Sequence, residues 1–526
     1  MSPIHAGPGR GLWLLYPASA LLLAQLAATA AHAAEEAQPA ADVAPGAQPP
    51  APETAATTPG AAAADAGYAA LKAGDPKAAA DRFVNALQHD DLAPDAHRAV
   101  VLTLSDTLAE LGQPDHAAAV LSLLKGQPDY ATASRLAFAL DAAGHKVEAA
   151  VAYRIAAPLA PTEAERLTMQ KGRVFDLAAS EEKADALAAA RPLVAAPGLT
   201  QADAVNLAYV AVKFRDDRLA LKFFDRAQAL APLTANVALD AAYSARRIGA
   251  DRHAVRYFKQ SLASNAAPAA GSPAAQQRFQ VRREVTDLTR RAGGSLAVFY
   301  DDAESLAGRA RRVGRGDVQV GGELYYRPFG FNGGRPVEVF ARMFETVGSR
   351  RGDPTGPQSL QGWVGVRAKP ITDVNLILEG SRLLKLGRTS IDDWELRAAY
   401  SASRGMDLRA DRSSWPVTNL YIDTARLIDA RETLALADAR VGRAFRVAAV
   451  PNLMVTPFIG AYAGYDSAQS PKNAAGIGPG VMLRQWLRET PDTAPQSAID
   501  LSLQYRIRLG GDKRASGFFL TFSAAY

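Results

Sequence analysis

The chain has 526 residues, a formal net charge of +5 and no cysteine. Its length is sufficient for two or three domains, and the lack of cysteine excludes disulfides, thiolate catalysis and cysteine-bound zinc. The charge is small for so long a chain, and no basic run is interleaved with aromatic residues, so we do not expect nucleic acid as a partner.

The first 33 residues have the pattern of a secretory signal peptide. Arg10 precedes an apolar run, Leu12–Leu26, and a cleavage sequence of the small-x-small type, Ala31–Ala33, follows it. The run is too short and too rich in alanine for a membrane anchor, and no other segment reaches the ~18 uninterrupted apolar residues of a transmembrane helix. We therefore expect the mature chain to begin near Ala34.

Residues 34–64 consist mainly of alanine, proline, threonine and glycine. Such a segment buries too little apolar surface to offset its loss of conformational entropy on folding. The composition therefore predicts a disordered linker.

Residues 65–264 repeat small and large residues at the spacing of tetratricopeptide repeats. A small residue lets two helices approach closely, an aromatic residue four positions later fills the groove between them, and glycine or proline ends a helix. We predict an α-solenoid of five or six helix pairs, with an alanine-rich helical bundle as the alternative. The residues predicted to make the repeat packing are Gly67, Ala79, Phe83, Gly144, Ala149, Tyr153, Ala220 and Phe224.

Residues 265–294 are predicted to connect two domains. Alanine, proline, glycine and serine over residues 265–273 indicate a hinge, and residues 276–292 indicate one polar helix. We expect the arginines of this helix to lie on a solvated face, with contact to lipid headgroups as the alternative. They are Arg282, Arg283, Arg290 and Arg291.

From residue 295 to residue 526 the helical period gives way to a period of two. Trp394 and Leu396 alternate with Glu395 and Arg397, and residues 499–509 alternate in the same way. Strands of about ten residues with one apolar face favour an antiparallel transmembrane β-barrel, and we count about twelve of them. A soluble β-sandwich that directs its charges into bulk water is the alternative.

The two faces of these strands have different predicted roles. The charged face is expected to line the lumen, through Glu379, Glu395, Arg397, Arg506 and Arg508. Aromatic residues near strand ends are expected to form an interfacial girdle, namely Trp363, Trp394, Tyr400, Tyr462, Tyr505 and Tyr526. The terminal strand carries an apolar outer face, which a barrel would pair on both edges, made by Phe518, Leu520, Phe522 and Tyr526.

Three stretches of the barrel half carry a family resemblance. Asn419–Ala425, Gly478–Arg484 and Phe518–Phe522 resemble the C-terminal domain of bacteriophage adsorption protein A (NfrA-like), over roughly residues 320–526. The order of signal peptide, repeats and barrel is also similar to that of outer-membrane polysaccharide export porins.

This resemblance implies a protein of the bacterial outer membrane with its N-terminal domain in the periplasm. It would work with a surface-glycan secretion system, and in one known case such a protein is used by a phage as receptor. The implied partners are outer-membrane lipid, the barrel-assembly machinery, glycan-secretion proteins that bind the repeats, and a polysaccharide or phage ligand.

We find no motif for catalysis, a cofactor or a metal. None of the seven histidines lies in the barrel half, and Gly476–Gly480 lacks the Lys-Ser/Thr that a phosphate-binding loop needs. The acidic pairs Asp301–Asp302 and Asp392–Asp393, and the tripeptide Arg351–Asp353, are typical of ordinary turns and loops. We therefore expect a protein that is not an enzyme.

Two functions remain open from the sequence. The protein is either a conduit or docking component for glycan export, or a binding and assembly protein whose barrel is only an anchor. A barrel of about twelve strands is narrow enough for inward side chains to fill it, so the strand count does not separate the two.

Overall fold

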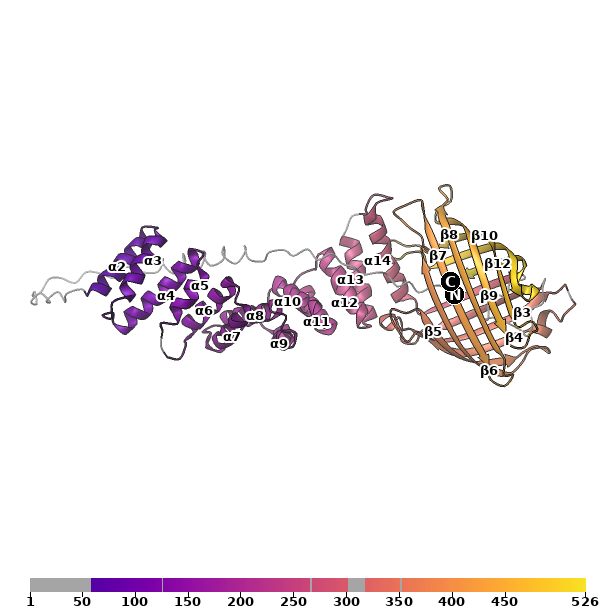
Figure 1. The fold of residues 1–526 in the computed structure, drawn as a ribbon, viewed down its shortest axis with the longest axis horizontal. Coiled ribbons are helices and arrows are strands. Elements are labelled where there is room, and N and C mark those ends of the chain that lie inside the picture. The colour runs from indigo at the N-terminus through magenta and orange to yellow at the C-terminus, as the bar shows by residue number, and fades with distance from the viewer. Residues whose placement is uncertain (1–57, 125, 265–266, 301–316, 351) are drawn as a thin grey trace, which may run out of the picture. The chain divides into compact units, whose positions relative to one another are not determined.

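The computed structural model describes residues 58–526 apart from 125, 265–266, 301–316 and 351 (Figure 1). The predicted signal peptide, most of the predicted linker and the Asp301–Asp302 pair lie outside the described residues. Helices come first along the chain and strands follow, which confirms the predicted order of an α-solenoid and an antiparallel barrel. The chain forms two compact units, divided between His145 and Lys146, and each is described by itself.

Thirteen α-helices precede the strands in the described part of the chain, enough for six pairs and one final helix. No helix among the described residues is long and apolar enough to cross a membrane. The helices are α2 Pro59–Lys72, α3 Pro76–Leu87, α4 Pro94–Glu110, α5 Pro114–Leu121, α6 Tyr130–Ala143, α7 Lys146–Ala156, α8 Glu163–Ala179, α9 Lys183–Ala190, α10 Gln201–Lys213, α11 Asp217–Leu230, α12 Ala235–Arg247, α13 Asp251–Ser264 and α14 Pro273–Thr289.

The first helix begins earlier than the composition predicts. The Thr58 side chain accepts a hydrogen bond from the Ala61 amide, and Pro59 occupies the first turn of α2, where its missing N–H costs nothing. Residues 59–64 are therefore helical, which corrects the end of the predicted linker.

The N-terminal unit packs small residues against aromatic ones. Ala79 and Phe83 of α3 are fully buried, and Tyr68 of α2 contacts the Phe83 ring edge-on at 5.0 Å between ring centroids. A Cβ atom on Gly67 would lie 2.6 Å from the Phe83 ring, so glycine is needed for this approach. Gly144 has another role: it ends α6 in the left-handed conformation, with φ 85°, and a Cβ on it would meet nothing within 4 Å.

The C-terminal unit repeats the arrangement in its own helices. Ala149, Tyr153, Ala220 and Phe224 are all buried. A Cβ atom on Gly172 of α8 would lie 2.6 Å from the Tyr153 ring, so glycine is needed here for the close approach of the ring, as it is at Gly67 for the Phe83 ring.

Twelve strands form a closed barrel in the described part of the chain (Figure 1). Each strand pairs antiparallel with the next, and β12 pairs with β1. The strands are β1 Ala292–Tyr300, β2 Val318–Tyr326, β3 Val337–Gly348, β4 Gln361–Ala368, β5 Leu376–Lys385, β6 Asp393–Arg404, β7 Ser414–Leu427, β8 Thr433–Arg446, β9 Leu453–Asp466, β10 Asn473–Leu487, β11 Ser497–Gly511 and β12 Gly517–Ala525.

The terminal strand is paired on both edges. Phe522 lies opposite Val298 of β1 and opposite Leu501 of β11. On its outer face Phe518 is exposed and Leu520 and Phe522 are half-buried, whereas Phe519, on the inner face, is buried.

The barrel is apolar outside and charged inside. In β6, Trp394 and Leu396 are 57% and 60% exposed, whereas Glu395 and Arg397 are each 4% exposed. A soluble sandwich would bury the apolar members of such a strand, so this finding excludes the sandwich. Further large apolar side chains exposed on the strands are Leu324, Val441, Ile459, Tyr505, Ile507 and Leu509.

Two members of the predicted aromatic girdle point inward instead. Trp363 and Tyr462 are buried, and the Trp363 indole Nε1 donates a hydrogen bond to Glu395 Oε2 at 3.1 Å. The Tyr462 ring lies 4.8 Å from the Arg506 guanidinium. The prediction was wrong for these two residues because their rings complement the interior charges.

Candidate functional site

Four of the five predicted lumen residues are buried inside the barrel. They are Glu379, Glu395, Arg397 and Arg506. Arg508 is exposed and donates a hydrogen bond to the carbonyl of Gly511, the last residue of β11. The pairing of β10 with β11 shifts register at Gly476, opposite Arg508, so this side chain lies at the strand end rather than in the packed interior.

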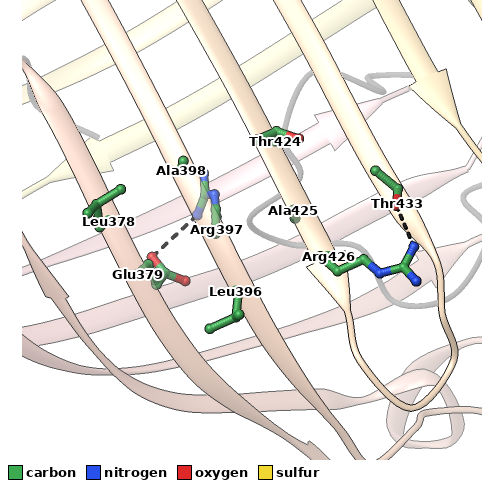
Figure 2. Close-up of a pocket in the computed structure, with 9 residues that line it drawn as sticks. All are labelled: Leu378, Glu379, Leu396, Arg397, Ala398, Thr424, Ala425, Arg426 and Thr433. Atoms are coloured by element: carbon green, nitrogen blue, oxygen red, sulfur yellow. Dashed lines mark hydrogen bonds and ion pairs between the residues drawn. The ribbon is translucent and has the colours of Figure 1, made fainter.

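Eight interior side chains form a continuous chain of alternating charge along the wall made by β2–β7. Successive N···O distances from Asp423 to Arg327 are 2.5, 3.5, 3.2, 2.7, 2.8, 2.5 and 2.7 Å. Four guanidinium groups and four carboxylates leave this ion chain neutral; Figure 2 shows its Glu379–Arg397 link. In order, its members are Asp423, Arg397, Glu379, Arg342, Glu323, Arg367, Glu338 and Arg327.

The Arg397–Asp423 pair is the most deeply buried link of the ion chain. Arg397 Nε donates to Asp423 Oδ1 at 2.8 Å and Nη2 donates to Oδ2 at 2.5 Å, while the Tyr421 hydroxyl donates to Oδ2 at 2.7 Å. The two side chains are 1% and 0% exposed. Each charge depends on the other, because a buried charge without a partner costs several kcal/mol.

Arg506 occupies the opposite wall. Its guanidinium lies 4.8 Å from the Tyr462 ring and 4.1 Å from the Phe519 ring, and its Nε donates to Gln504 Oε1 at 2.9 Å. Gln504 in turn donates from Nε2 to the Gly460 carbonyl at 3.1 Å. Aromatic faces and amide groups therefore surround this cation in place of water.

These contacts bear on whether the interior is open. Charged groups that line a water-filled lumen stay hydrated and exposed, as in the wide porins. Here the Arg342, Glu379 and Arg397 side chains are each 1% exposed. At the level of the ion chain, the interior is filled with side chains.

Helix α14 contacts the barrel loops at one end. Its Phe279 packs with Leu408, Trp415 and Met454 in a buried apolar cluster. The Gln276 side chain accepts a hydrogen bond from the backbone amide of Ala410 at 2.7 Å. The β6–β7 loop is thus held against the helix by apolar and polar contacts together.

The arginines of α14 bind barrel loops, which corrects the predicted solvated face. Arg283 binds Asp407 through Nε and Nη2 at 3.0 and 2.6 Å and donates to the Pro495 carbonyl at 2.7 Å. Arg282 donates to the Thr493 carbonyl at 2.6 Å. These contacts fix α14 to the β6–β7 and β10–β11 loops.

A second contact joins α12 and the start of α13 to the β2–β3 loop. The Asp251 carboxylate accepts hydrogen bonds from the backbone amides of Phe331 and Asn332 at 2.8 and 3.4 Å. The Arg246 guanidinium lies 5.2 Å from the Phe331 ring. Helices α12–α14 therefore contact three loops at the same end of the barrel.

Several carboxyl groups in this helical region have a raised pKa, among them Glu284 and Asp287. Burial raises the pKa of Glu284 in α14 to about 7, while Arg246, 2.6 Å away, acts in the opposite direction. Asp287, one turn further along, also has a raised pKa because of its burial. We therefore expect the contact between α12 and α14 to depend on pH near neutrality.

The sequence analysis missed most of the ion chain. Glu323, Arg327, Glu338, Arg342, Arg367 and Asp423 were not among the predicted lumen residues. A signal was present, because Arg342 lies between the outward residues Ala341 and Met343 in β3. Among the described residues, no group of three or more His, Cys, Asp or Glu side chains is placed to hold a metal ion.

The solved structures that are similar to this chain include helical-repeat proteins and an outer membrane channel. The C-terminal part of a TPR repeat-containing protein from Cytophaga hutchinsonii is 14% identical, with a TM-score of 0.31, over 42% of this chain and 84% of that one. An outer membrane channel from Pseudomonas putida F1 is 13% identical, with a TM-score of 0.26, over 45% of this chain and 94% of that one. At these TM-scores, neither likeness adds to the argument.

The sequence comparisons are more informative. No curated protein sequence matches this chain. A family described as the C-terminal domain of bacteriophage N adsorption protein A matches residues 352–522, from the β3–β4 loop to β12. This match confirms the resemblance predicted from Asn419–Ala425, Gly478–Arg484 and Phe518–Phe522. Over residues 352–522, this chain is therefore similar to the family described as the bacteriophage N adsorption protein A C-terminal domain.

Proposed function

We propose that the protein is an outer-membrane docking component of a surface-glycan secretion system. In this proposal the barrel is a closed anchor rather than a conduit, and the helical repeats bind partners in the periplasm. The protein acts by binding, without a catalytic step.

The outer-membrane location is supported by the surface of the barrel. Its strands expose large apolar side chains and bury charged ones, which is unfavourable in water and favourable in a bilayer. Eleven of the twelve described strands have nine or more residues, which suits a tilted crossing of the bilayer. The terminal strand β12 is paired on both edges, so the barrel has no free edge to expose to lipid. Cell fractionation tests the location: we expect the full chain with the outer membrane, and recovery as a free periplasmic protein would contradict it.

The anchor role is carried by the buried ion chain. Passage of a polymer would require its four arginines and four carboxylates to separate and rehydrate, and each broken link of a buried pair costs about 3–5 kcal/mol. The contacts of α12–α14 with three loops support the same conclusion, because they cover part of one end of the barrel.

Single-channel recording tests the anchor role. The purified full chain in a planar bilayer is expected to give no steady openings, while a porin from the same preparation conducts. Steady openings on the nanosiemens scale would make the barrel a conduit for the same secretion system.

The partners are proposed from the family and from the repeats. Stacked helix pairs present extended surfaces that are suited to a protein or a polymer, so we propose that they bind glycan-secretion proteins in the periplasm. The name of the family supports a role of the loops at the other end of the barrel as a phage attachment site. Deletion of the protein is expected to reduce secreted glycan and phage adsorption; unchanged glycan secretion would remove the secretion role.

A further inference from the structure

A shallow apolar groove crosses the outer face of β5, β6 and β7 (Figure 2). It encloses about 350 Å³. Ala398 and Thr424 are paired neighbours on β6 and β7, and their short side chains leave a depression. Leu378 and Leu396 border it, and Arg426 lies beside Leu396, its partner across the two strands.

The groove lies near the barrel end that faces away from α14. Arg426 is the second-last residue of β7, close to the β7–β8 hairpin, whereas α14 contacts the β6–β7 loop at the other end of the same strand. In the proposed orientation, with the helices in the periplasm, this end faces the outer leaflet and the cell exterior.

Arg426 is an exposed cation on an otherwise apolar surface. Its Nη1 donates to Thr433 Oγ1 at 2.6 Å, and this partner is neutral. A second cation lies nearer the strand ends: the Arg382 guanidinium is 5.4 Å from the Trp394 ring and 3.8 Å from Asp429. A hydroxyl group does not neutralise the arginine charge. Near the end of a strand, at the level of the lipid headgroups, such a cation costs only about 0–1 kcal/mol and is within reach of anionic headgroup atoms.

We propose that Arg426 and this groove bind one phosphorylated lipid of the outer leaflet. An acyl chain occupies the apolar groove, and a headgroup phosphate binds the Arg426 guanidinium, which matches phosphate oxygens in a bidentate geometry. A groove without a cation would not select among lipids, and a cation without a groove would hold any anion. Their adjacency selects a lipid that carries both groups. The site rests on the outer-membrane location proposed above.

Native mass spectrometry of the full chain in detergent tests the site without depending on the membrane. The probes are rough lipopolysaccharide, the same lipid after dephosphorylation, and inorganic phosphate. The chain offers a matched control: Arg443 of β8 is also exposed and donates to a hydroxyl, that of Ser414 at 3.0 Å, but does not line the groove. Arg426→Gln should weaken binding of the phosphorylated lipid about tenfold or more, and Arg443→Gln should not.

A second variant fills the groove and leaves the charge. Ala398→Phe should weaken binding of both lipids while the folded barrel keeps its heat-modifiable mobility. Equal effects of Arg426→Gln and Arg443→Gln, or inorganic phosphate that binds Arg426 as tightly as the lipid does, would overturn the proposal. Cell fractionation of strains that produce these variants tests the outer-membrane location separately. If the protein is found in the outer membrane but the variants bind the lipids as the unchanged protein does, the lipid site is refuted and the location is not.

Discussion

The charge of Asp423 is expected to be essential for the stability of the barrel. Asp423→Asn keeps the shape of the side chain but removes the charge, leaving Arg397 with Glu379 at 3.5 Å, a carboxylate that Arg342 already binds at 3.2 Å. The two hydrogen bonds from Arg397 to Asp423, at 2.8 and 2.5 Å, no longer have a charged acceptor in this variant. The ion chain is then left with a net positive charge in the buried interior. Because asparagine retains one acceptor, we expect a loss of about 3 kcal/mol, the lower end of the range for a broken buried pair.

Equilibrium unfolding by urea in lipid vesicles, followed by tryptophan fluorescence, measures this change. Asp429→Asn is the matched control, because the Arg382–Asp429 pair is longer, at 3.8 Å, and its side chains are 33% and 64% exposed. We expect the control to change the free energy of unfolding by less than about 1 kcal/mol. The double variant Arg397→Met, Asp423→Leu removes one charge of each sign and should recover most of the loss.

Equal effects of Asp423→Asn and Asp429→Asn would refute this reasoning. They would mean that water reaches Arg397 and that the interior is not packed. The closed-anchor proposal would then lose the observation that carries it.

Three further predictions concern other parts of the chain. Val441→Arg, at mid-strand, should lower the stability of the barrel in a bilayer by about 2–4 kcal/mol, and Leu509→Arg, near a strand end, by about 0–1 kcal/mol, although the two residues are similarly exposed, at 64% and 69%. Heat-modifiable mobility on a gel measures both variants, and equal effects would argue against a bilayer around the barrel. Ala79→Arg should destabilise the N-terminal unit by several kcal/mol and exposed Ala69→Arg hardly at all, as measured by thermal melting. Burial raises the pKa of Glu284 to about 7, so the folded state keeps this proton to a higher pH than the unfolded state does, and the free energy of unfolding should fall by up to about 3 kcal/mol as pH rises from 4.5 to 7. In urea unfolding measured at several pH values, Glu284→Gln should flatten this dependence, and an unchanged dependence would contradict the raised pKa.

The sequence predicted the order of domains because each element has its own period. Gly67, Ala79 and Phe83 recur at helical spacing, and Glu395 and Arg397 alternate with Trp394 and Leu396 in a period of two. The helical period and the period of two each show which residues share a face. The exposed fractions of the side chains in the structure then show which face of the strands lies inside the barrel.

The partners of individual residues were not predictable in the same way. The period places Arg342 on the inner face, but its ion pair with Glu379 depends on how three strands are staggered. Arg283 binds Asp407, a residue 124 positions away in a loop without a periodic pattern. Trp363 was predicted outside because aromatic residues near strand ends often are, and its hydrogen bond to Glu395 carries no mark in the sequence.

The pairing of β1 with β12 also sets an order of events in biogenesis. Leu296 lies opposite Ala524, so the first strand synthesised completes its hydrogen bonds only with the last. Contacts between distant parts of a chain form late, because loop closure costs entropy before any contact compensates it. The helices depend on local contacts and are able to fold while the strands are still emerging. The barrel half must wait, with its apolar strands unpaired, and over that interval it needs a chaperone more than the helical half does.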